Sequence, residues 1–438
     1  MRNKNWLLLF VISFAGFASR SQQNTQHLTL REAINASVSN NDGARLSELD
    51  IKIAEAKFRE TNAMMLPAAN LSYTGISTNN PLNAFGSKLQ QGSITPADFN
   101  PELLNNPSAT SDFSTKIELL QPLLNLDMLY QRKGATKEIE MYQFISKRTK
   151  DYLRFEAEKA YLQLQMAYSE NEVLIETLNS SSAIHKVSCD YYNQGLIQKS
   201  DLLGSEVQVL NAETQVKNSE SAIQDASDLL SLLMGKSLGT IYKIDSIVVN
   251  SDMTLDSLKF SEGRADFKAI QKGMESYELV IKSSRMSLFP RLNGFASYQL
   301  NDKAMFGFGA KSYLAGIRMS WNLLNGGKVK NTISQLRLEQ EKLGMQLDQK
   351  KNEAQIEINH ARRQLIDATF LMKQQRLAVE QASEALRVLQ TRYGQGLAKT
   401  SDVLAAQTQL AQQKIAYVQV LFNHNLSAAT LQYLTIDK

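Results

Sequence analysis

The side chains that most often perform catalysis or bind metals are few and scattered in this sequence. Its histidines, His27, His185, His360 and His424, have no spacing typical of metal ligands. A single cysteine, Cys189, can form neither an intramolecular disulfide nor a thiolate cluster. No nucleophile and base occur together in a recognisable pattern. We therefore expect no enzyme activity, no cofactor and no metal site.

Neither a nucleotide nor a nucleic acid is an expected ligand. Residues 234–237 (MGKS) end like a phosphate-binding loop, but Leu230 stands where that motif needs glycine. The formal charge of +4 includes Arg2, Lys4 and Arg20, which lie in a segment that we expect to be removed. Without these three cations about +1 remains, which gives no electrostatic case for nucleic-acid binding.

The most informative polar residues belong to a motif that occurs twice. Tyr192, Gly195, Ser200 and Asp201 recur 201 positions later, and the second set is Tyr393, Gly396, Ser401 and Asp402. Glycine after one helix and Ser-Asp before the next are typical of a tight corner between two helices. Ser-Asp can simply cap the return helix, or the carboxylates can also set the electrostatics of a narrow opening, and both roles can coexist.

Further landmarks repeat in the same order. Residues 117–125 (IELLQPLLN) match residues 317–325 (IRMSWNLLN), and Leu66-Pro67 corresponds to Phe289-Pro290. The chain is therefore expected to hold two copies of one unit. The predicted divisions are a signal peptide at 1–21, a first repeat at 22–235, a linker at 236–262 and a second repeat at 263–438.

The N-terminal segment has the order of an export signal. Arg2 and Lys4 precede an apolar stretch, 6–18, and small residues follow it, so cleavage is expected after Ala18 or Ser21. The alternative is an ordinary buried N-terminal helix. No later run of 18 apolar residues predicts a membrane-spanning helix.

Long helices dominate the expected secondary structure. The expected helices are 30–66, 128–193, 200–235, 264–289, 327–393 and 401–434. Between Leu347 and Tyr393, apolar residues recur at alternating steps of four and three, which predicts a left-handed coiled coil. A plain amphipathic helix is the alternative, although this length is unusual for one. Stacking short helices against each long one predicts a rod with strands at one end and the glycine corners at the other.

Period-two alternation predicts four strands, at about 71–79, 113–121, 291–300 and 312–321. Each has an apolar and a polar face, with Phe295 as an exception, and a length of about nine residues suits a membrane-spanning barrel strand. Closure needs about eight strands, so three chains sharing a twelve-stranded barrel are expected. The alternative is a small sheet that caps a soluble coiled coil. Because of its prolines, residues 80–111 are expected to be an exposed loop without regular elements.

These junctions and corners resemble those of the TolC-type outer-membrane efflux protein family over about residues 28–434. The resemblance implies a mainly α fold with a β-barrel part, in which a homotrimer forms a periplasmic α-barrel and a shared outer-membrane barrel. It implies an exit duct in the outer membrane that works with a periplasmic adaptor and an inner-membrane pump. It also implies that Asp201, Tyr393 and Asp402 lie at a periplasmic constriction and that Gly195 and Gly396 form the helix corners.

The sequence departs from the family pattern in two places. Leu126-Asp127 stands where the first copy would have a glycine pair such as Gly326-Gly327. Ala398 and Ala405 occupy positions where a basic and a second acidic residue would help to lock the closed state. Two other functions are the alternatives: a structural coiled-coil protein of the cell envelope, which would need no two-faced strands, and a periplasmic adaptor, which would have a single helical hairpin.

Overall fold

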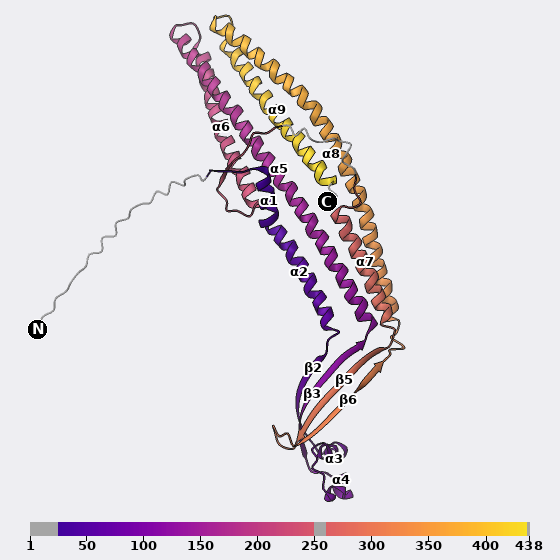
Figure 1. Ribbon diagram of the computed structural model, residues 1–438. Coiled ribbons are helices and arrows are strands. Elements are labelled where there is room, and N and C mark those ends of the chain that lie inside the picture. Colours follow the sequence, from indigo (N-terminus) through magenta and orange to yellow (C-terminus); the bar gives the residue numbers. More distant parts are fainter. Residues whose placement is uncertain (1–24, 249–259, 436–438) are drawn as a thin grey trace, which may run out of the picture. The chain divides into compact units, whose positions relative to one another are not determined.

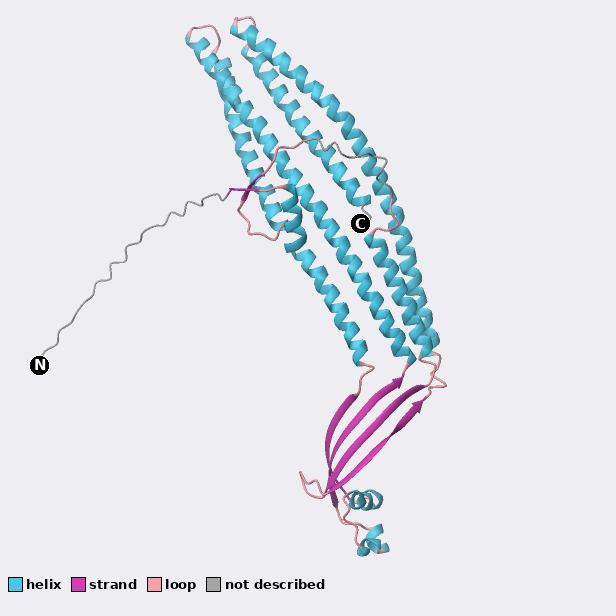
Figure 2. Ribbon diagram, in the orientation of Figure 1, coloured by secondary structure: helices cyan, strands magenta, loops and turns pink. Residues whose placement is uncertain are grey.

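The computed structural model describes residues 25–248 and 260–435. The expected signal peptide, 1–21, and part of the expected linker, 236–262, lie outside the described residues. The described chain is mostly helical and carries a four-stranded sheet, which confirms the mainly α fold class with a β part (Figures 1 and 2). It divides into two compact units, and the longest helices contribute residues to both.

Unit 1 comprises the described residues within Met1–Asn41, Glu156–Ser251 and Ile366–Leu426. Its elements are β1 (Thr25–His27), α1 (Leu30–Asn40), the second part of α5 (Leu126–Asn193), α6 (Lys199–Leu233), β4 (Ile241–Lys243), the last part of α8 (Lys328–Gly394) and most of α9 (Thr400–Thr435). One buried cluster joins α1, α5, α6 and β4, and it includes Ala33, Leu164, Leu230 and Tyr242.

The parallel pair of β1 and β4 in unit 1 was not predicted from the sequence. Each strand has only three residues, too few for a recognisable alternation. The pair is held by tyrosines of α5: Tyr161 donates to the carbonyl of Leu28 at 3.2 Å, and Tyr168 donates to that of Tyr242 at 2.8 Å. Contacts distant in sequence therefore create this element.

Unit 2 comprises the described residues within Asp42–Phe155, Asp252–Leu365 and Ser427–Lys438. Its helices are α2 (Asp42–Ala63), α3 (Pro81–Gln90), α4 (Pro101–Asn105), the first part of α5, α7 (Ala265–Met286), the first part of α8 and the end of α9. The strands of this unit are β2 (Ala68–Thr78), β3 (Thr110–Leu124), β5 (Arg291–Asp302) and β6 (Ala310–Ser320). Among the helices of the described chain, none is both long enough and apolar enough to cross a membrane.

The apolar seam predicted along α8 is buried. Its residues that are no more than 8% exposed are Leu347, Ala354, Ile358, Ala361, Leu365, Ala368, Leu386 and Tyr393. In unit 2, Leu347 and Ala354 pack with Phe267 of α7, while Ile358 packs with Leu431 of α9. The seven-residue repeat therefore identified the packed face of this helix correctly.

The expected helix 30–66 is divided into α1 and α2 at Asn41. The backbone of Asn41 is extended, and its side-chain amide donates to the carbonyl of Leu233 at 3.0 Å.

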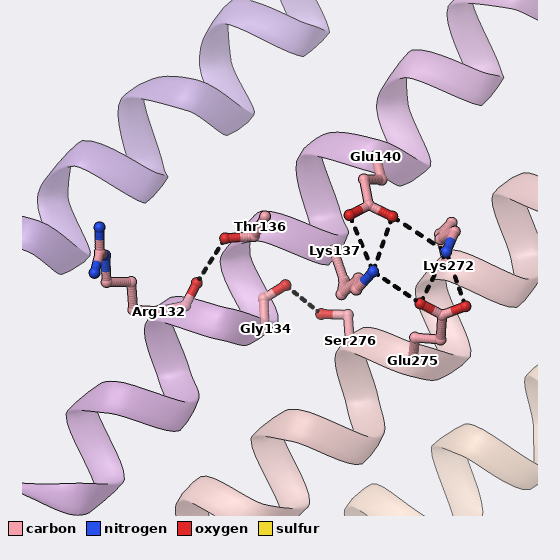
Figure 3. Close-up of polar contacts among 8 residues, drawn as sticks. All are labelled: Arg132, Gly134, Thr136, Lys137, Glu140, Lys272, Glu275 and Ser276. Carbon is pink, nitrogen blue, oxygen red and sulfur yellow. Dashed lines mark hydrogen bonds and ion pairs between the residues drawn. The ribbon is translucent and has the colours of Figure 1, made fainter.

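A polar cluster joins α5 to α7 in unit 2 (Figure 3). Lys137 lies 3.0 Å from Glu140 and 3.2 Å from Glu275, while Lys272 lies 3.1 Å and 3.0 Å from the same two carboxylates. The hydrogen bond from Lys272 is the largest cause of a lowered pKa at Glu275; burial opposes it and Lys137 adds to it. Nearby, Ser276 donates to the carbonyl of Gly134 at 3.0 Å. Each lysine therefore contacts both carboxylates, one on its own helix and one on the other.

The four longer strands form one antiparallel sheet in the order β2-β3-β5-β6 (Figure 1). The predicted alternation is kept in its register. One row across an apolar face is Leu71, Ile117, Tyr298 and Tyr313, and the neighbouring row on the polar face is Ser72, Lys116, Gln299 and Ser312. Strands β2 and β6 lie at the two edges of this sheet, and each has a sheet partner on one side within the described chain.

The expectation of no regular element within 80–111 was wrong. Helix α3, a 3₁₀ turn at Pro96–Phe99 and helix α4 occur there. Each begins with a proline, and each is preceded by a residue, Asn80, Thr95 or Asn100, suited to capping. Proline is tolerated at the first helical position because that residue's missing N–H would have no partner inside the helix anyway. The prolines therefore start these helices rather than prevent them.

Candidate functional site

The two glycine corners in unit 1 have the same backbone geometry. The connection from α5 to α6 places Gly195 at φ 74°, and that from α8 to α9 places Gly396 at φ 72°. In the first, Gly195 donates to the carbonyl of Tyr192 at 2.9 Å and Leu196 donates to that of Tyr191 at 2.9 Å. The second repeats this pair of bonds, at 2.9 and 2.8 Å. Both are Schellman ends, which favour glycine because a side chain at positive φ is strained.

Asp201 and Asp402 lie in the first turns of the two return helices. A carboxylate oxygen of Asp201 accepts from the backbone N–H of Gln198 at 3.3 Å, and one of Asp402 accepts from that of Lys399 at 3.4 Å. Both therefore act on the helix start, where backbone N–H groups lack partners and negative charge is favoured. Asp201 is half-buried, whereas Asp402 is exposed, so the second carboxylate is the more open to solvent.

Tyr393 lies inside unit 1, where it links three helices. It is 5% exposed and packs with Ile184 of α5 and Val403 of α9. Its hydroxyl lies 3.1 Å from that of Ser188 on α5 and 3.0 Å from that of Thr400 on α9. Tyr393 thus fixes the ends of α8 and α9 against α5 beside the corners.

The first copy of the motif lacks this arrangement. Tyr192, the counterpart of Tyr393, is 38% exposed, and Lys199 stands where the second copy has the buried Thr400. Within the described residues, no hydrogen bond or ion pair joins Asp201, Tyr393 and Asp402 to one another. The three residues share the corner region of unit 1 but make separate contacts there.

Sequence reasoning missed the partners of the second corner on α5. Three residues of α5 are spaced by four and seven positions, like the residues of an apolar seam, but they are small and polar: Thr177, Ser181 and Ser188. Gln407 of α9 donates to the carbonyl of Thr177 and to the hydroxyl of Ser181, each at 2.8 Å. A search for this spacing that included Ser and Thr, and not only apolar residues, would have found this face.

Side chains that could bind a metal ion do not gather in one place among the described residues. They contain no group of three or more His, Cys, Asp or Glu side chains that could hold a metal ion. His185 does contact Ser205 at 2.8 Å, and Cys189 lies 3.6 Å from the other ring nitrogen. The hydroxyl of Ser205 donates to the carbonyl of Leu202 within α6 at 2.7 Å, and the contact of His185 with Ser205 links α5 to α6 within unit 1.

Apolar side chains remain exposed on two helices of unit 2, α2 and α8. On α2 the exposed residues Leu46, Leu49 and Ile53 lie on one face, with exposed fractions of 50 to 62%. On α8 the exposed set is Leu338, Met345 and Ile356, at 64 to 70%. Large apolar side chains at regular spacing on an outer helix indicate a contact surface for another protein or another copy. The open edges of the sheet, β2 and β6, belong to the same unit.

A sequence model of the outer membrane efflux protein family matches residues 259–435. This segment holds α7, the hairpin of β5 and β6, α8 and α9, with the second corner between the last two helices. The resemblance to the TolC-type outer-membrane efflux protein family is confirmed. The matched family is one of efflux proteins of the outer membrane rather than of enzymes.

Solved structures of outer-membrane proteins share the fold of this chain. The CmeC channel of Campylobacter jejuni has a TM-score of 0.78 at 13% identity, and the match covers 93% of this chain and 85% of CmeC. VceC of Vibrio cholerae gives 0.75 at 16%, covering 93% and 96%, and MtrE of Neisseria gonorrhoeae gives 0.71 at 14%, covering 93% and 88%. At these identities the likeness establishes a common fold. No curated protein matches the sequence.

Proposed function

We propose that this protein is the outer-membrane exit duct of a tripartite efflux or type I secretion system and that it works as a homotrimer. The observation that carries the proposal is the four-stranded sheet, which has an apolar and a polar face and two open edges. In lipid, unpaired backbone groups at such edges cost several kcal/mol each, roughly, so an open sheet needs closure. The family match and the shared channel fold support the same assignment.

Three copies would close the sheet by pairing β6 of one chain with β2 of the next. Twelve strands then enclose a lumen, whereas the four strands of one chain are too few. The apolar row with Leu71, Ile117, Tyr298 and Tyr313 would face lipid, and the row with Lys116 and Gln299 would line the lumen.

The exposed apolar faces of α2 and α8 would pack against each other in neighbouring copies. Each of these two helices is next to an edge strand of unit 2 in the sequence: α2 precedes β2, and α8 follows β6. One trimer contact would therefore continue from the sheet edges to the helices. Burying side chains such as Ile53 and Ile356 contributes roughly 1.5–3 kcal/mol each by apolar transfer.

The helical part would extend into the periplasm, where an adaptor and an inner-membrane pump would contact it and open it. In this arrangement the corners at Gly195 and Gly396 would mark the periplasmic tip. Asp201, Tyr393 and Asp402 would lie at its constriction, with Asp402 the most exposed of the three. The duct itself would be passive.

Oligomeric state and conductance test the proposal together. Protein extracted from outer membranes should be trimeric by native mass spectrometry and should conduct ions in a planar bilayer. The variant Ile356→Glu should lower the trimer fraction, while Gln355→Glu, which adds the same charge at the adjacent exposed position, should not. A non-conducting monomer from the soluble periplasmic fraction would refute the duct.

Orientation has a separate test. The segment between β2 and β3, which holds α3 and α4, would face the cell exterior, so protease added to intact cells should cut there. The connection between β5 and β6, residues 303–309, is shorter and should be cut less. Cleavage only after the envelope is opened would place the sheet the other way round.

A further inference from the structure

One aromatic side chain lies on the polar face of the sheet. Phe295 of β5 is directly opposite Gly316 of β6, and its ring covers that glycine so closely that a Cβ there would lie 3.0 Å from the ring. Leu120 of β3 is opposite Phe295 on the other side. Phe295 thus departs from the alternation that the rest of the strand follows.

Covering a glycine does not by itself explain this placement. On the other edge strand, Gly75 of β2 is directly opposite Phe113 of β3, and a Cβ at Gly75 would lie 2.9 Å from that ring. That pair lies on the apolar face, where Tyr73 stacks against Phe113. Aromatic cover of an edge glycine is therefore compatible with the lipid-facing side, and Phe295 needs a further reason to face the polar side.

The neighbour of Phe295 supplies that reason. The guanidinium of Arg318 lies 5.0 Å from the centre of the Phe295 ring, within the range of a cation–π contact. Arg318 is exposed, and no carboxylate of the described chain lies within ion-pair distance of it. The other cations of this face are paired: Lys116 with Glu118, and Arg291 with Asp127.

Trimer closure would leave Arg318 unpaired. The strand that would join β6 is β2 of the next copy, whose eleven residues, AANLSYTGIST, include no charged side chain. Asp112 is also on the polar face, but it lies about 30 Å from Arg318 along the sheet, counted at 3.3 Å per residue. This distance is far beyond the ~8 Å over which charges interact in physiological salt. Asp112 is held by Asn301 and Gln91.

Apolar side chains complete the surface around this cation. Leu120 and Leu314 are on the same face as Phe295 and are 44% and 63% exposed. A face that would line a water-filled lumen thus presents an aromatic ring, two leucines and one unpaired guanidinium together. This combination matches a solute with an aromatic or aliphatic body and one negative charge.

We propose that Phe295, Arg318, Leu120 and Leu314 form a recognition surface in the barrel lumen for aromatic organic anions, such as arenesulfonates and arenecarboxylates. The inference rests on the proposed function, because it needs the polar face to line a conducting lumen. Arg318 would attract the anionic group, and the ring and leucines would contact the solute's apolar body. Threefold symmetry would place three such surfaces around the barrel and favour anions there.

Ion selectivity tests the charge. In planar bilayers with a KCl gradient, Arg318→Gln should lower the chloride-to-potassium permeability ratio by at least about fivefold, because one unit charge near 4 Å in water changes the local chloride concentration about fivefold and that of potassium in the opposite direction. The matched control is Lys311→Gln, which removes a cation from the same strand on its opposite face and should leave the ratio unchanged. Equal ratios for both variants and the unmodified protein would overturn the proposal.

Blocking tests the solute class. Naphthalene-2-sulfonate should reduce single-channel current at lower concentration than methanesulfonate or naphthalene-2-methanol, and Phe295→Leu should weaken this block. The comparison among the three solutes uses the unmodified protein, so it holds even if a variant fails to assemble. Equal block by the three would overturn the proposal, whereas an unmodified protein that does not conduct would refute the duct instead.

Discussion

The hydroxyl of Tyr393 lies 3.1 Å from that of Ser188, so α8 and α5 share a buried hydrogen bond beside the corners of unit 1. Tyr393→Phe should destabilise this region by about 1–2 kcal/mol, because the hydroxyls of Ser188 and Thr400 would lose a buried partner. Amide hydrogen exchange over 186–196 and 390–402 should become faster. The control is Tyr192→Phe at the exposed counterpart, which should change exchange little; equal effects would contradict the structural role of Tyr393.

Gly396 has a φ of 72°, and Gly396→Ala should destabilise the second corner by about 1–2 kcal/mol through backbone strain. Space is not the cause, since no atom would lie within 4 Å of the added Cβ. Gly394→Ala makes the same chemical change two residues earlier, in the last helical position of α8, where alanine should stabilise by about 0.5–1 kcal/mol. Opposite shifts in the thermal midpoint would support this account, and destabilisation by both would not.

How much of the fold could be predicted from the sequence depends on what the side chains contribute to packing. The seam of α8 was predicted because apolar residues such as Leu347 and Ile358 mark a packed face directly. The buried serines of α5, Ser181 and Ser188, were missed because they pack by small size and hydrogen bonding, which a hydrophobic pattern does not register. The expected loop at 80–111 is wrong because proline can begin a helix as well as break one, as Pro81 does in α3.

In the candidate site too, the sequence predicted some features and missed others. The sequence placed Gly195, Gly396 and the two Ser-Asp pairs in one motif, because glycine and capping residues act locally. It also marked Phe295 as an exception to alternation. It did not show that Arg318 lies over that ring, because the contact depends on the pairing of Gly316 with Phe295 across two strands. Local signals are readable along the chain, whereas cross-strand contacts depend on register.

The Lys–Glu cluster of α5 and α7 predicts a pH dependence. Because Lys272 and then Lys137 lower the pKa of Glu275 below its usual value, the folded state holds this carboxylate charged more strongly than the unfolded state does. Its stabilisation is complete above the usual glutamate pKa of about 4.3 and is lost as pH falls through the lowered folded value. Glu275→Gln should therefore reduce stability at pH 7 and have little effect near pH 3.

Thermal midpoints of the unmodified protein and of Glu275→Gln, measured from pH 7 down to pH 3, would test this sign. The difference should be small at neutral pH, under about 1 kcal/mol, because Glu275 is 42% exposed and solvent screens the cluster. Glu341→Gln, at an exposed position on α8, is the control and should change the midpoint less. A difference between Glu275→Gln and the unmodified protein that grows as pH falls would contradict the assignment.

The last prediction separates two roles of Asp402. Its carboxylate accepts from the N–H of Lys399 at 3.4 Å, and asparagine can keep that cap while removing the charge. If three copies of Asp402 surround the proposed periplasmic constriction, Asp402→Asn should fold as a normal trimer yet lose cation preference and block by multivalent cations. Asp201→Asn, at a half-buried position, should change both less. A normal Asp402→Asn trimer with unchanged selectivity and block would leave only the capping role, because the charge would then have no effect on the ions that pass.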